Sequence, residues 1–311
     1  MTLWTEVADD ENYKKVLDHG FVGLVDCMGD DHAIVQAARA SYGKGTKSVN
    51  QDRGLIRYLV SHFHTTPLEM VEFKFHLKMP IFVMRQHVRH RMASINEYSG
   101  RYSVMNDEFY IPDRSRLQAQ SSTNKQGSGD TLGDLEAEIA LNTIQRVSAE
   151  NYLDYLSLIG DEHGRSYGLV NPQGLTRELA RTVLPINNYT ELYWKIDLKN
   201  LLHYINLRAD SHAQWEIQQF ANIFAEFVRA KCPLAYEAFE DYWQWGNVVT
   251  VSRMEKNLMQ ELIVVSNTHN VGVQAAWQQV QASFETSNQL LEFFNLSKRE
   301  LLAFQQQWGL V

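Results

Sequence analysis

Val-Glu-Phe-Lys-Phe-His-Leu-Lys at residues 71–78 and Thr-Glu-Leu-Tyr-Trp-Lys-Ile-Asp at residues 190–197 are the stretches that decide the fold class. In both, apolar and polar side chains alternate, which is the pattern of a half-buried antiparallel β-strand. The segments around them have the apolar spacing of helices, at positions three and four residues apart. We therefore expect an α+β fold, with helices around a central and largely antiparallel sheet.

The remaining predicted elements follow from the same periodicities and from local stop signals. They are a strand at 21–28 and helices at 31–40, 52–63, 80 to about 93, 198–209 and 213–230. Asp197 is expected to cap the helix that follows it. Residues 114–134 are rich in Ser, Gly, Gln and Thr without an apolar period, and we interpret them as a flexible insertion within a first domain, 1–246. Residues 247–311 are expected to form a helical C-terminal extension, in which Ser297 and Glu300 make a capping box.

Composition and charge exclude several classes of protein. The 311 residues are 44% hydrophobic and carry a net charge of −8, so the surface repels nucleic acid and anionic lipid. No apolar run is long enough to span a membrane, and no secretory leader is evident at the first residues. The two cysteines, Cys27 and Cys232, suit a reducing compartment. We therefore expect a cytoplasmic enzyme with no nucleic-acid or membrane partner.

The arginines of residues 85–101 indicate an anion-binding site. Arg85, Arg89, Arg91 and Arg101 stand against one acid, Glu97, so four positive charges and one negative give a local charge of +3 in an acidic chain. A salt-bridged surface helix is the ordinary explanation of such a cluster. The polar residues that follow, from 94 to 102, favour instead a loop in which forked guanidinium contacts hold a phosphorylated substrate.

Two other classes of function are consistent with parts of the sequence. A metal-dependent nucleotide phosphohydrolase would use a histidine and aspartate cluster: His62, His64, His87, His90, His203, His212 and Asp210. The chain has neither an H-E-x-x-H motif nor an adjacent His-Asp pair, so we expect no metal. An RNA-binding module would use the arginines, but the acidic total and the absence of an aromatic-basic stripe disfavour it.

Arg89-His90-Arg91 followed by Ser99 resembles the R-H-R-x7-S motif of the flavin-dependent thymidylate synthases, the ThyX family. The likeness extends through Ser94, Asn96, Glu97, Gly100, Arg101 and Tyr102, to 64–69 upstream, and to 177–185 and 207–214 downstream. It covers roughly residues 18–240 and implies a ThyX-like sheet and helices. The extension has no counterpart in the shortest relatives.

The resemblance implies reductive methylation of dUMP to dTMP. In this family 5,10-methylenetetrahydrofolate supplies the carbon, FAD carries the hydride and NADPH is the reductant. The other type of thymidylate synthase needs an accessible cysteine thiolate. Cys27 lies in an apolar predicted strand and Cys232 precedes a proline, so neither belongs to the arginine cluster. A flavin hydride is therefore the better means of activating the pyrimidine ring.

The resemblance also assigns roles to residues. Arg208 would activate dUMP by its fixed positive charge, although an arginine at a helix C-terminus is also typical of dipole stabilisation. Residues that would bind dUMP are Gln86, Arg89, Glu97, Ser99, Gly100, Arg101, Arg181 and Arg208. Residues that would bind FAD are Ser41, Thr66, Glu69, Arg89, His90, Arg91, Asn96, Glu97, Asp197, Lys199 and His203. His64 and Tyr102 would flank the folate, nicotinamide or flavin rings.

Some features of the chain leave this assignment open or depart from the family pattern. Lys199 is equally consistent with a solvated lysine in the first turn of a helix. Met70 follows Glu69 where histidine is expected, and His203 stands where either Asn or His suits the family. Family members are homotetramers whose active sites are shared between subunits, so the resemblance implies the same assembly here.

Overall fold

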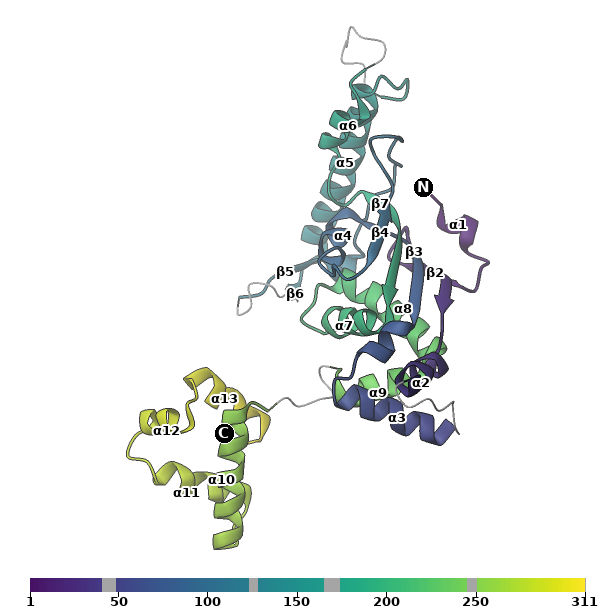
Figure 1. The fold of residues 1–311 in the computed structure, drawn as a ribbon. Helices are drawn as coiled ribbons and strands as arrows, with labels where there is room; N and C mark the ends of the chain where they lie inside the picture. Colours follow the sequence, from purple (N-terminus) through teal and green to yellow (C-terminus); the bar gives the residue numbers. More distant parts are fainter. Residues whose placement is uncertain (41–48, 123–127, 165–173, 245–250, 311) are drawn as a thin grey trace. The chain divides into compact units, whose positions relative to one another are not determined.

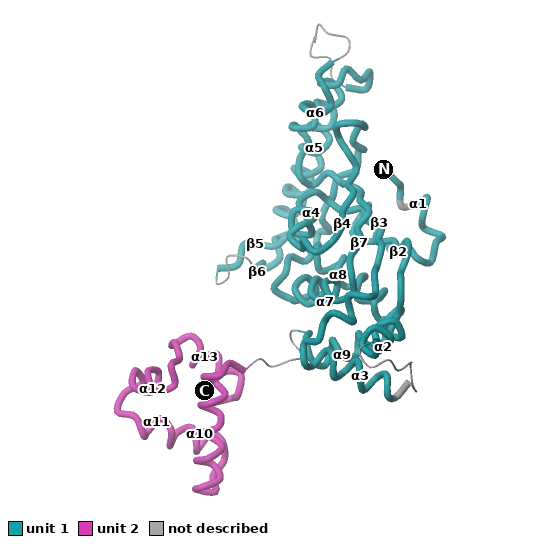
Figure 2. Tube along the Cα trace, viewed as in Figure 1, with its two compact units in different colours: residues 1–248 teal, residues 249–311 magenta. Residues whose placement is uncertain are grey.

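The computed structural model describes residues 1–40, 49–122, 128–164, 174–244 and 251–310. The chain forms two compact units, Met1–Val248 and Val249–Val311, which are coloured teal and magenta in Figure 2. Each has its own apolar core. The predicted strands and helices that position the candidate site all belong to the first unit.

A five-stranded sheet is the centre of the first unit (Figure 1). Every pair of neighbouring strands is antiparallel, which confirms the predicted α+β class. The strand order is β1 (Tyr13–Val16), β2 (Gly20–Met28), β3 (Glu72–Pro80), β7 (Tyr189–Asp197) and β4 (Ser94–Glu97). The two alternating stretches are thus the central neighbours β3 and β7, each within two residues of its predicted bounds.

The alternation along β3 and β7 builds an aromatic core on one face of the sheet. Phe75 pairs in register with Trp194, and both side chains are fully buried. The Trp194 ring lies 5.2 Å from the Phe224 ring of α8 and 5.3 Å from the Tyr204 ring of α7. Burying aromatic side chains of this size contributes strongly to stability. Helices α7 and α8 are therefore fixed on the sheet by this aromatic core.

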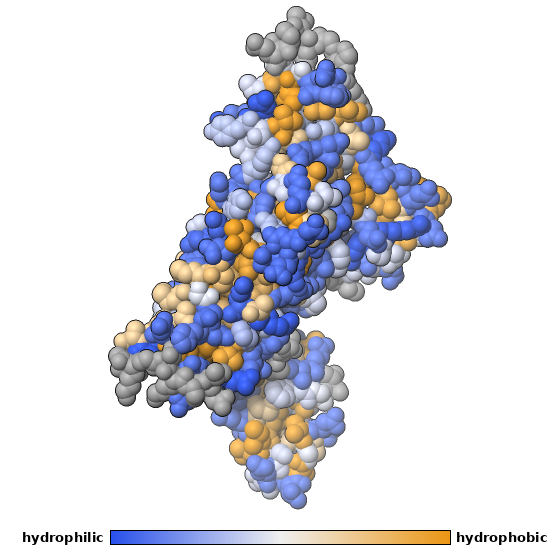
Figure 3. All heavy atoms as spheres, turned by 90° about the vertical axis from the view of Figure 1, so that its right-hand side faces the viewer, coloured by the Kyte–Doolittle hydropathy of each residue, from blue (hydrophilic) through white to orange (hydrophobic). Residues whose placement is uncertain are grey.

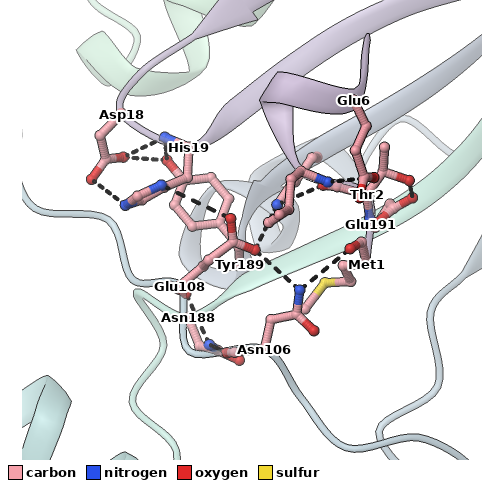
Figure 4. A network of polar contacts seen from close by, with 12 residues as sticks. Met1, Thr2, Glu6, Asp18, His19, Asn106, Glu108, Asn188, Tyr189 and Glu191 are labelled. Carbon is pink, nitrogen blue, oxygen red and sulfur yellow. Dashed lines mark hydrogen bonds and ion pairs between the residues drawn. The ribbon is translucent and has the colours of Figure 1, made fainter.

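The other face of β3 is less exposed than the alternation predicts, because remote segments cover it. Lys78 is fully buried and its Nζ donates to Glu108 Oε2 at 2.6 Å and to the Thr2 carbonyl at 2.8 Å. Glu191 accepts from the Thr2 amide at 2.6 Å and contacts His76 Nε2 at 2.6 Å. Burial acts to raise the pKa of Glu191, but these hydrogen bonds outweigh it and hold the pKa at about 2. Figure 4 shows the network around Thr2, Glu108 and Glu191.

The remaining elements of the first unit surround the sheet (Figure 1). They are α1 (Trp4–Val7), α2 (Asp31–Ala40), α3 (Val49–Ser61), η1 (Thr66–Met70), α4 (Ile81–His87), η2 (Arg114–Arg116), β5 (Gln118–Gln120), β6 (Ser128–Thr131), α5 (Asp134–Leu158), α6 (Arg177–Ala180), η3 (Arg181–Val183), α7 (Leu198–Arg208), α8 (Trp215–Lys231) and α9 (Pro233–Tyr242). The Asp197 carboxylate accepts from the Asn200 amide at 2.9 Å, which confirms the predicted cap of α7.

Two predictions about local structure are wrong. The helix expected from 80 to about 93 ends at His87, and residues 94–97, expected in a loop, form β4 at the edge of the sheet beside β7. Arg85 and Arg89 therefore do not share a helix face, because Arg89 lies beyond the helix end. The described residues of the insertion 114–134 contain η2 and the β5–β6 hairpin, and its flexibility stays a prediction. Residues 123–127 lie outside the described residues.

The second unit consists of helices packed on a small core of their own. Its elements are α10 (Arg253–His269), α11 (Val273–Ala282), α12 (Ser287–Phe294) and α13 (Lys298–Gln307). Leu262, Trp277 and Phe304 are among the buried side chains of this core. Ser297 Oγ accepts from the Glu300 main-chain amide and the Glu300 carboxylate accepts from the Ser297 amide, which confirms the predicted capping box.

The surface of the molecule mixes polar and apolar side chains. On the face that Figure 3 presents, hydrophobic residues interrupt a mainly hydrophilic surface at several places. Across the described ranges of the chain, none of the helices is both long and apolar enough to cross a membrane.

Candidate active site

A cavity of about 500 Å³ lies where the turn after α4 meets the sheet and α7. The turn contributes cationic side chains, the sheet contributes Ile196, and α7 contributes polar and basic residues. The lining residues are Arg89, His90, Arg91, Met92, Ile196, Asn200, His203, Leu207 and Arg208. The R-H-R triplet and Arg208, more than a hundred positions apart in sequence, therefore share one cavity.

His90 and Arg208 are in direct contact. Arg208 Nε donates to His90 Nε2 at 3.0 Å, and Arg208 Nη2 donates to the Gln86 carbonyl at 3.4 Å. Burial, and then the positive charge of Arg208, lower the pKa of His90 to about 4. The imidazole is thus neutral near pH 7 and can accept the bond. This contact fixes the guanidinium at the edge of the cavity.

The cavity is electropositive because no carboxylate in the described part of the chain neutralises its arginines. Within the residues that the structure describes, no carboxylate forms an ion pair with Arg89, Arg91 or Arg208, whereas Arg53, Arg57 and other surface arginines are paired. Guanidinium groups that line a cavity without acidic partners favour an anionic ligand. His203, whose ring lies 5.9 Å from that of His90, completes the basic lining.

The first turn of α7 forms one wall of this cavity. Asp197 caps the helix, and Asn200 Nδ2 donates to the Asp197 carboxylate at 2.6 Å. Lys199 Nζ donates to Asn200 Oδ1 at 3.1 Å, so Lys199 is tied into the same turn. Asn200 is a lining residue that sequence reasoning missed. It lies one helical turn after Asp197 and one before His203. This spacing from two candidate residues is the signal that could have found it.

A second group of predicted residues lies around the turn that follows β4. Gly100 is buried, and a methyl group there would lie 3.0 Å from Met105 Sδ and 3.3 Å from Arg181 Cδ. Arg101 Nε donates to Glu178 Oε2 at 3.0 Å, and Arg181 Nε donates to the Glu178 carbonyl at 3.3 Å. The structure thus brings Gly100, Arg101 and Arg181 together, but these arginines are not among the residues that line the cavity.

Glu97 and Tyr98 connect this turn to the sheet. Thr190 Oγ1 donates to Glu97 Oε1 at 2.7 Å, and the Tyr98 amide donates to the Glu191 carbonyl at 2.8 Å. Ser99 Oγ accepts from the Arg101 amide at 3.3 Å, so its hydroxyl shapes the turn. Asn96 is exposed on β4.

The remaining predicted residues are more dispersed. Thr66 and Glu69 belong to η1, which packs against α2 and α7. His64 is exposed beside Tyr58, and Tyr102 is 78% exposed. Neither His64 nor Tyr102 lines the cavity. Ser41 lies outside the described residues.

The histidines do not gather into a metal centre. His87 is fully buried, its ring 4.3 Å from Trp194, and its Nδ1 contacts the Tyr204 hydroxyl at 3.0 Å. His212 contacts Asp210 at 2.8 Å on the surface. Among the described residues, no three His, Cys, Asp or Glu side chains form a group that could hold a metal ion.

The cysteines are poorly placed to act as nucleophiles. Burial raises the pKa of Cys27 to about 11, and burial also raises the pKa of Cys232 well above its ordinary value. Neither cysteine lines the cavity. A reaction at this cavity therefore has no thiolate available from the lining residues.

An α+β fold with an arginine-lined cavity between its sheet, the turn after α4 and α7 has the features of an enzyme that binds anionic ligands. The model of the family "Thymidylate synthase complementing protein" matches residues 23–234. Two curated flavin-dependent thymidylate synthases are similar: that of Rickettsia bellii is 51% identical over 251 residues, which is 80% of this chain and 84% of that protein. That of Gluconobacter oxydans is 54% identical over 228 residues, covering 73% and 72%. The chain belongs to the family of flavin-dependent thymidylate synthases.

Solved structures agree with this placement. The UMP/dUMP methylase PolB from Streptomyces cacaoi, solved bound with 5-Br dUMP, has a TM-score of 0.64 and 28% sequence identity to this chain. The match covers 74% of this chain and 99% of PolB. The family resemblance drawn from the motif is thus confirmed, and the phosphohydrolase alternative is not supported.

Proposed function

We propose that this protein forms dTMP by reductive methylation of dUMP, with 5,10-methylenetetrahydrofolate as carbon donor, FAD as the flavin and NADPH as the reductant. The observation that carries the proposal is the cavity at which Arg89, Arg91 and Arg208 converge, with no ion pair from any carboxylate that the structure describes. Both FAD and dUMP carry phosphate, which such a cluster binds. The catalytic residues would all lie within 1–246, and 247–311 would be an accessory extension.

The lining of the cavity fits a flavin. Ile196 and Leu207 supply apolar surface for a ring system, while Arg89, His90 and Arg91 supply donors for phosphate or carbonyl oxygens. Thr66, Glu69, Asn96, Glu97, Asp197, Lys199 and His203, together with Ser41, would complete the FAD site. When bound, the flavin would carry reducing equivalents from NADPH to the transferred carbon.

The nucleotide would be held by residues from two places in the chain. Arg89 and Arg208 line the cavity, and Gln86 is bonded to Arg208 through its main-chain carbonyl. Glu97 ends β4, Ser99, Gly100 and Arg101 lie in the turn after it, and Arg181 of η3 lies beside Gly100. A homotetramer in which each active site takes residues from more than one subunit would unite them around one dUMP. Exposed apolar side chains on α5, among them Leu135 at 71% and Ile139 at 58%, support a subunit contact there.

Arg208 would act on the uracil ring by charge alone. A guanidinium keeps its proton throughout the accessible pH range, so it stabilises negative charge on N3 and the adjacent carbonyl without serving as a base. The bonds to neutral His90 and to the Gln86 carbonyl support this role, because they fix Arg208 in place before substrate binds. No cysteine adduct is needed to make the ring nucleophilic.

The test uses the full-length protein with its flavin. The extracted cofactor should be FAD by chromatography, and dUMP should bind to the loaded protein. Arg208→Lys keeps the charge but loses the planar fork, so turnover should fall by a factor of about 100 or more while FAD content stays normal. Arg229→Lys is the matched control, since Arg229 pairs with Glu240 on the surface and does not line the cavity. Unchanged turnover in Arg208→Lys would rule out the role of Arg208.

A further inference from the structure

Glu216, in the first turn of α8, is a buried carboxylate with two hydrogen-bond donors. Glu216 is only 8% exposed. The Tyr110 hydroxyl donates to Oε1 at 3.1 Å, and Gln214 Nε2 donates to Oε2 at 2.8 Å. A carboxylate has no proton to give, so both neighbours must act as donors. Glu216 therefore dictates the orientation of the Gln214 amide.

The orientation of Gln214 in turn sets that of Gln86. With its nitrogen on Glu216, Gln214 presents its oxygen to the next side chain, and Gln86 Nε2 donates to that oxygen. The nitrogen end of the Gln86 amide is thereby engaged, which leaves Oε1 as the end that remains for another partner. A glutamine in place of Glu216 could donate or accept, so it would be compatible with either orientation of the Gln214 amide.

Gln86 is also tied to Arg208. Its main-chain carbonyl accepts from Arg208 Nη2 at 3.4 Å, so its side chain extends from a point adjacent to the cavity. Gln214 and Glu216 line a separate cavity of about 540 Å³ together with Tyr110 and Phe82. The hydrogen-bonded series thus runs from a buried acid toward the proposed nucleotide site.

We propose that Glu216 is a positioning residue for nucleotide recognition, acting through Gln214 to present Gln86 Oε1 as an acceptor for a donor group of dUMP. This inference rests on the proposed function, in which Gln86 contacts the nucleotide. Glu216 touches neither substrate nor flavin. A purely structural role, as an acid in the first turn of α8, would affect folding instead of nucleotide affinity.

The test is a titration of dUMP into the FAD-loaded protein by calorimetry. Glu216→Gln should weaken dUMP binding about 3- to 10-fold, which corresponds to the loss of one oriented hydrogen bond. FAD content and melting temperature should stay near those of wild type. Glu226→Gln on the same helix, which loses only a surface contact with Lys14, is the matched control and should bind normally. Tyr110→Phe removes the other donor to Glu216 without altering the Gln214 orientation, so it should also leave dUMP affinity nearly unchanged.

A double-mutant cycle separates an effect through the Glu216–Gln214–Gln86 hydrogen bonds from a general loss of structure around the site. In a Gln86→Ala background, Glu216→Gln should cause no further loss, because the group it orients is gone. Wild-type affinity in Glu216→Gln, or an equal loss in the Gln86→Ala background, would overturn the proposal. If Glu216→Gln does not fold, Gln214→Met cuts the same series and should show the same loss; normal affinity there would also overturn it. A wild-type protein that binds FAD but not dUMP would refute the proposed function instead.

Discussion

Replacing Lys78 with methionine tests how much of the fold depends on the polar network at the end of β3. Lys78 is fully buried and its ammonium lies 2.6 Å from Glu108, which is 12% exposed as a side chain. Removing one partner of a buried pair leaves the other charge uncompensated, at a cost of about 3–5 kcal/mol. For a unit of this size each kcal/mol corresponds to about 2–4 °C, so the melting temperature should fall by roughly 6–20 °C.

The assay is differential scanning calorimetry at one protein concentration without ligands, since ligands and subunit association shift the transition. Lys195→Met is the control, because Lys195 on β7 pairs with Glu72 at 3.1 Å while its side chain is 51% exposed. It should lose no more than about 1 kcal/mol. The double variant Lys78→Met with Glu108→Leu should recover most of the stability, as both charges are gone. Equal melting temperatures for Lys78→Met and Lys195→Met would refute the reasoning.

Three further predictions concern the turn, the pH response and the cysteines. Gly100→Ala should weaken dUMP binding by calorimetry with FAD content unchanged, since the added methyl would lie 3.3 Å from Arg181 Cδ; normal dUMP affinity would contradict the placement of this turn. The folded-state pKa of Glu191, about 2, lies below its ordinary 4.5, so its stabilisation is present above pH 4.5 and is lost as the pH falls toward 2. The melting temperature of Glu191→Gln should therefore differ from wild type at pH 7, and the difference should shrink below about pH 4.5; a difference independent of pH would count against it. Cys27→Ser with Cys232→Ala should keep the turnover per bound flavin, whereas complete loss in a folded, flavin-loaded variant would indicate a thiol mechanism.

The sheet could be predicted from sequence because its two central strands carry a period that only a strand satisfies. What the period could not give is the burial of Lys78, whose partners Thr2 and Glu108 come from remote segments. The end of α4 was missed for a related reason. The apolar spacing continues to Val88 and arginine is a good helix former, so nothing local marks a stop at His87. Pairing with β7 is what makes residues 94–97 a strand.

The part of the candidate site that could be predicted from the sequence is the part that a family motif contains. Arg89, His90 and Arg208 were chosen from sequence and do share a cavity. Asn200 was not chosen, although it lies one helical turn from both Asp197 and His203, and its side-chain amide is held in the wall by the bond to Asp197. The hydrogen bonds that link Glu216, Gln214 and Gln86 could not be predicted from the sequence either, since the direction of a hydrogen bond depends on which side chains meet in space. That Arg101 and Arg181 join the same site in the assembled protein stays a prediction.

The central claim is that this chain makes dTMP with a flavin and an arginine, and product formation tests it most directly. Purified protein should be stripped of flavin and incubated with dUMP, 5,10-methylenetetrahydrofolate and NADPH, with and without added FAD, and dTMP measured by mass spectrometry. We predict dTMP only in the samples that contain FAD, and its near-complete loss in Arg208→Lys. Formation of dTMP at the same rate without flavin, or none under any of these conditions by folded protein, would contradict the account.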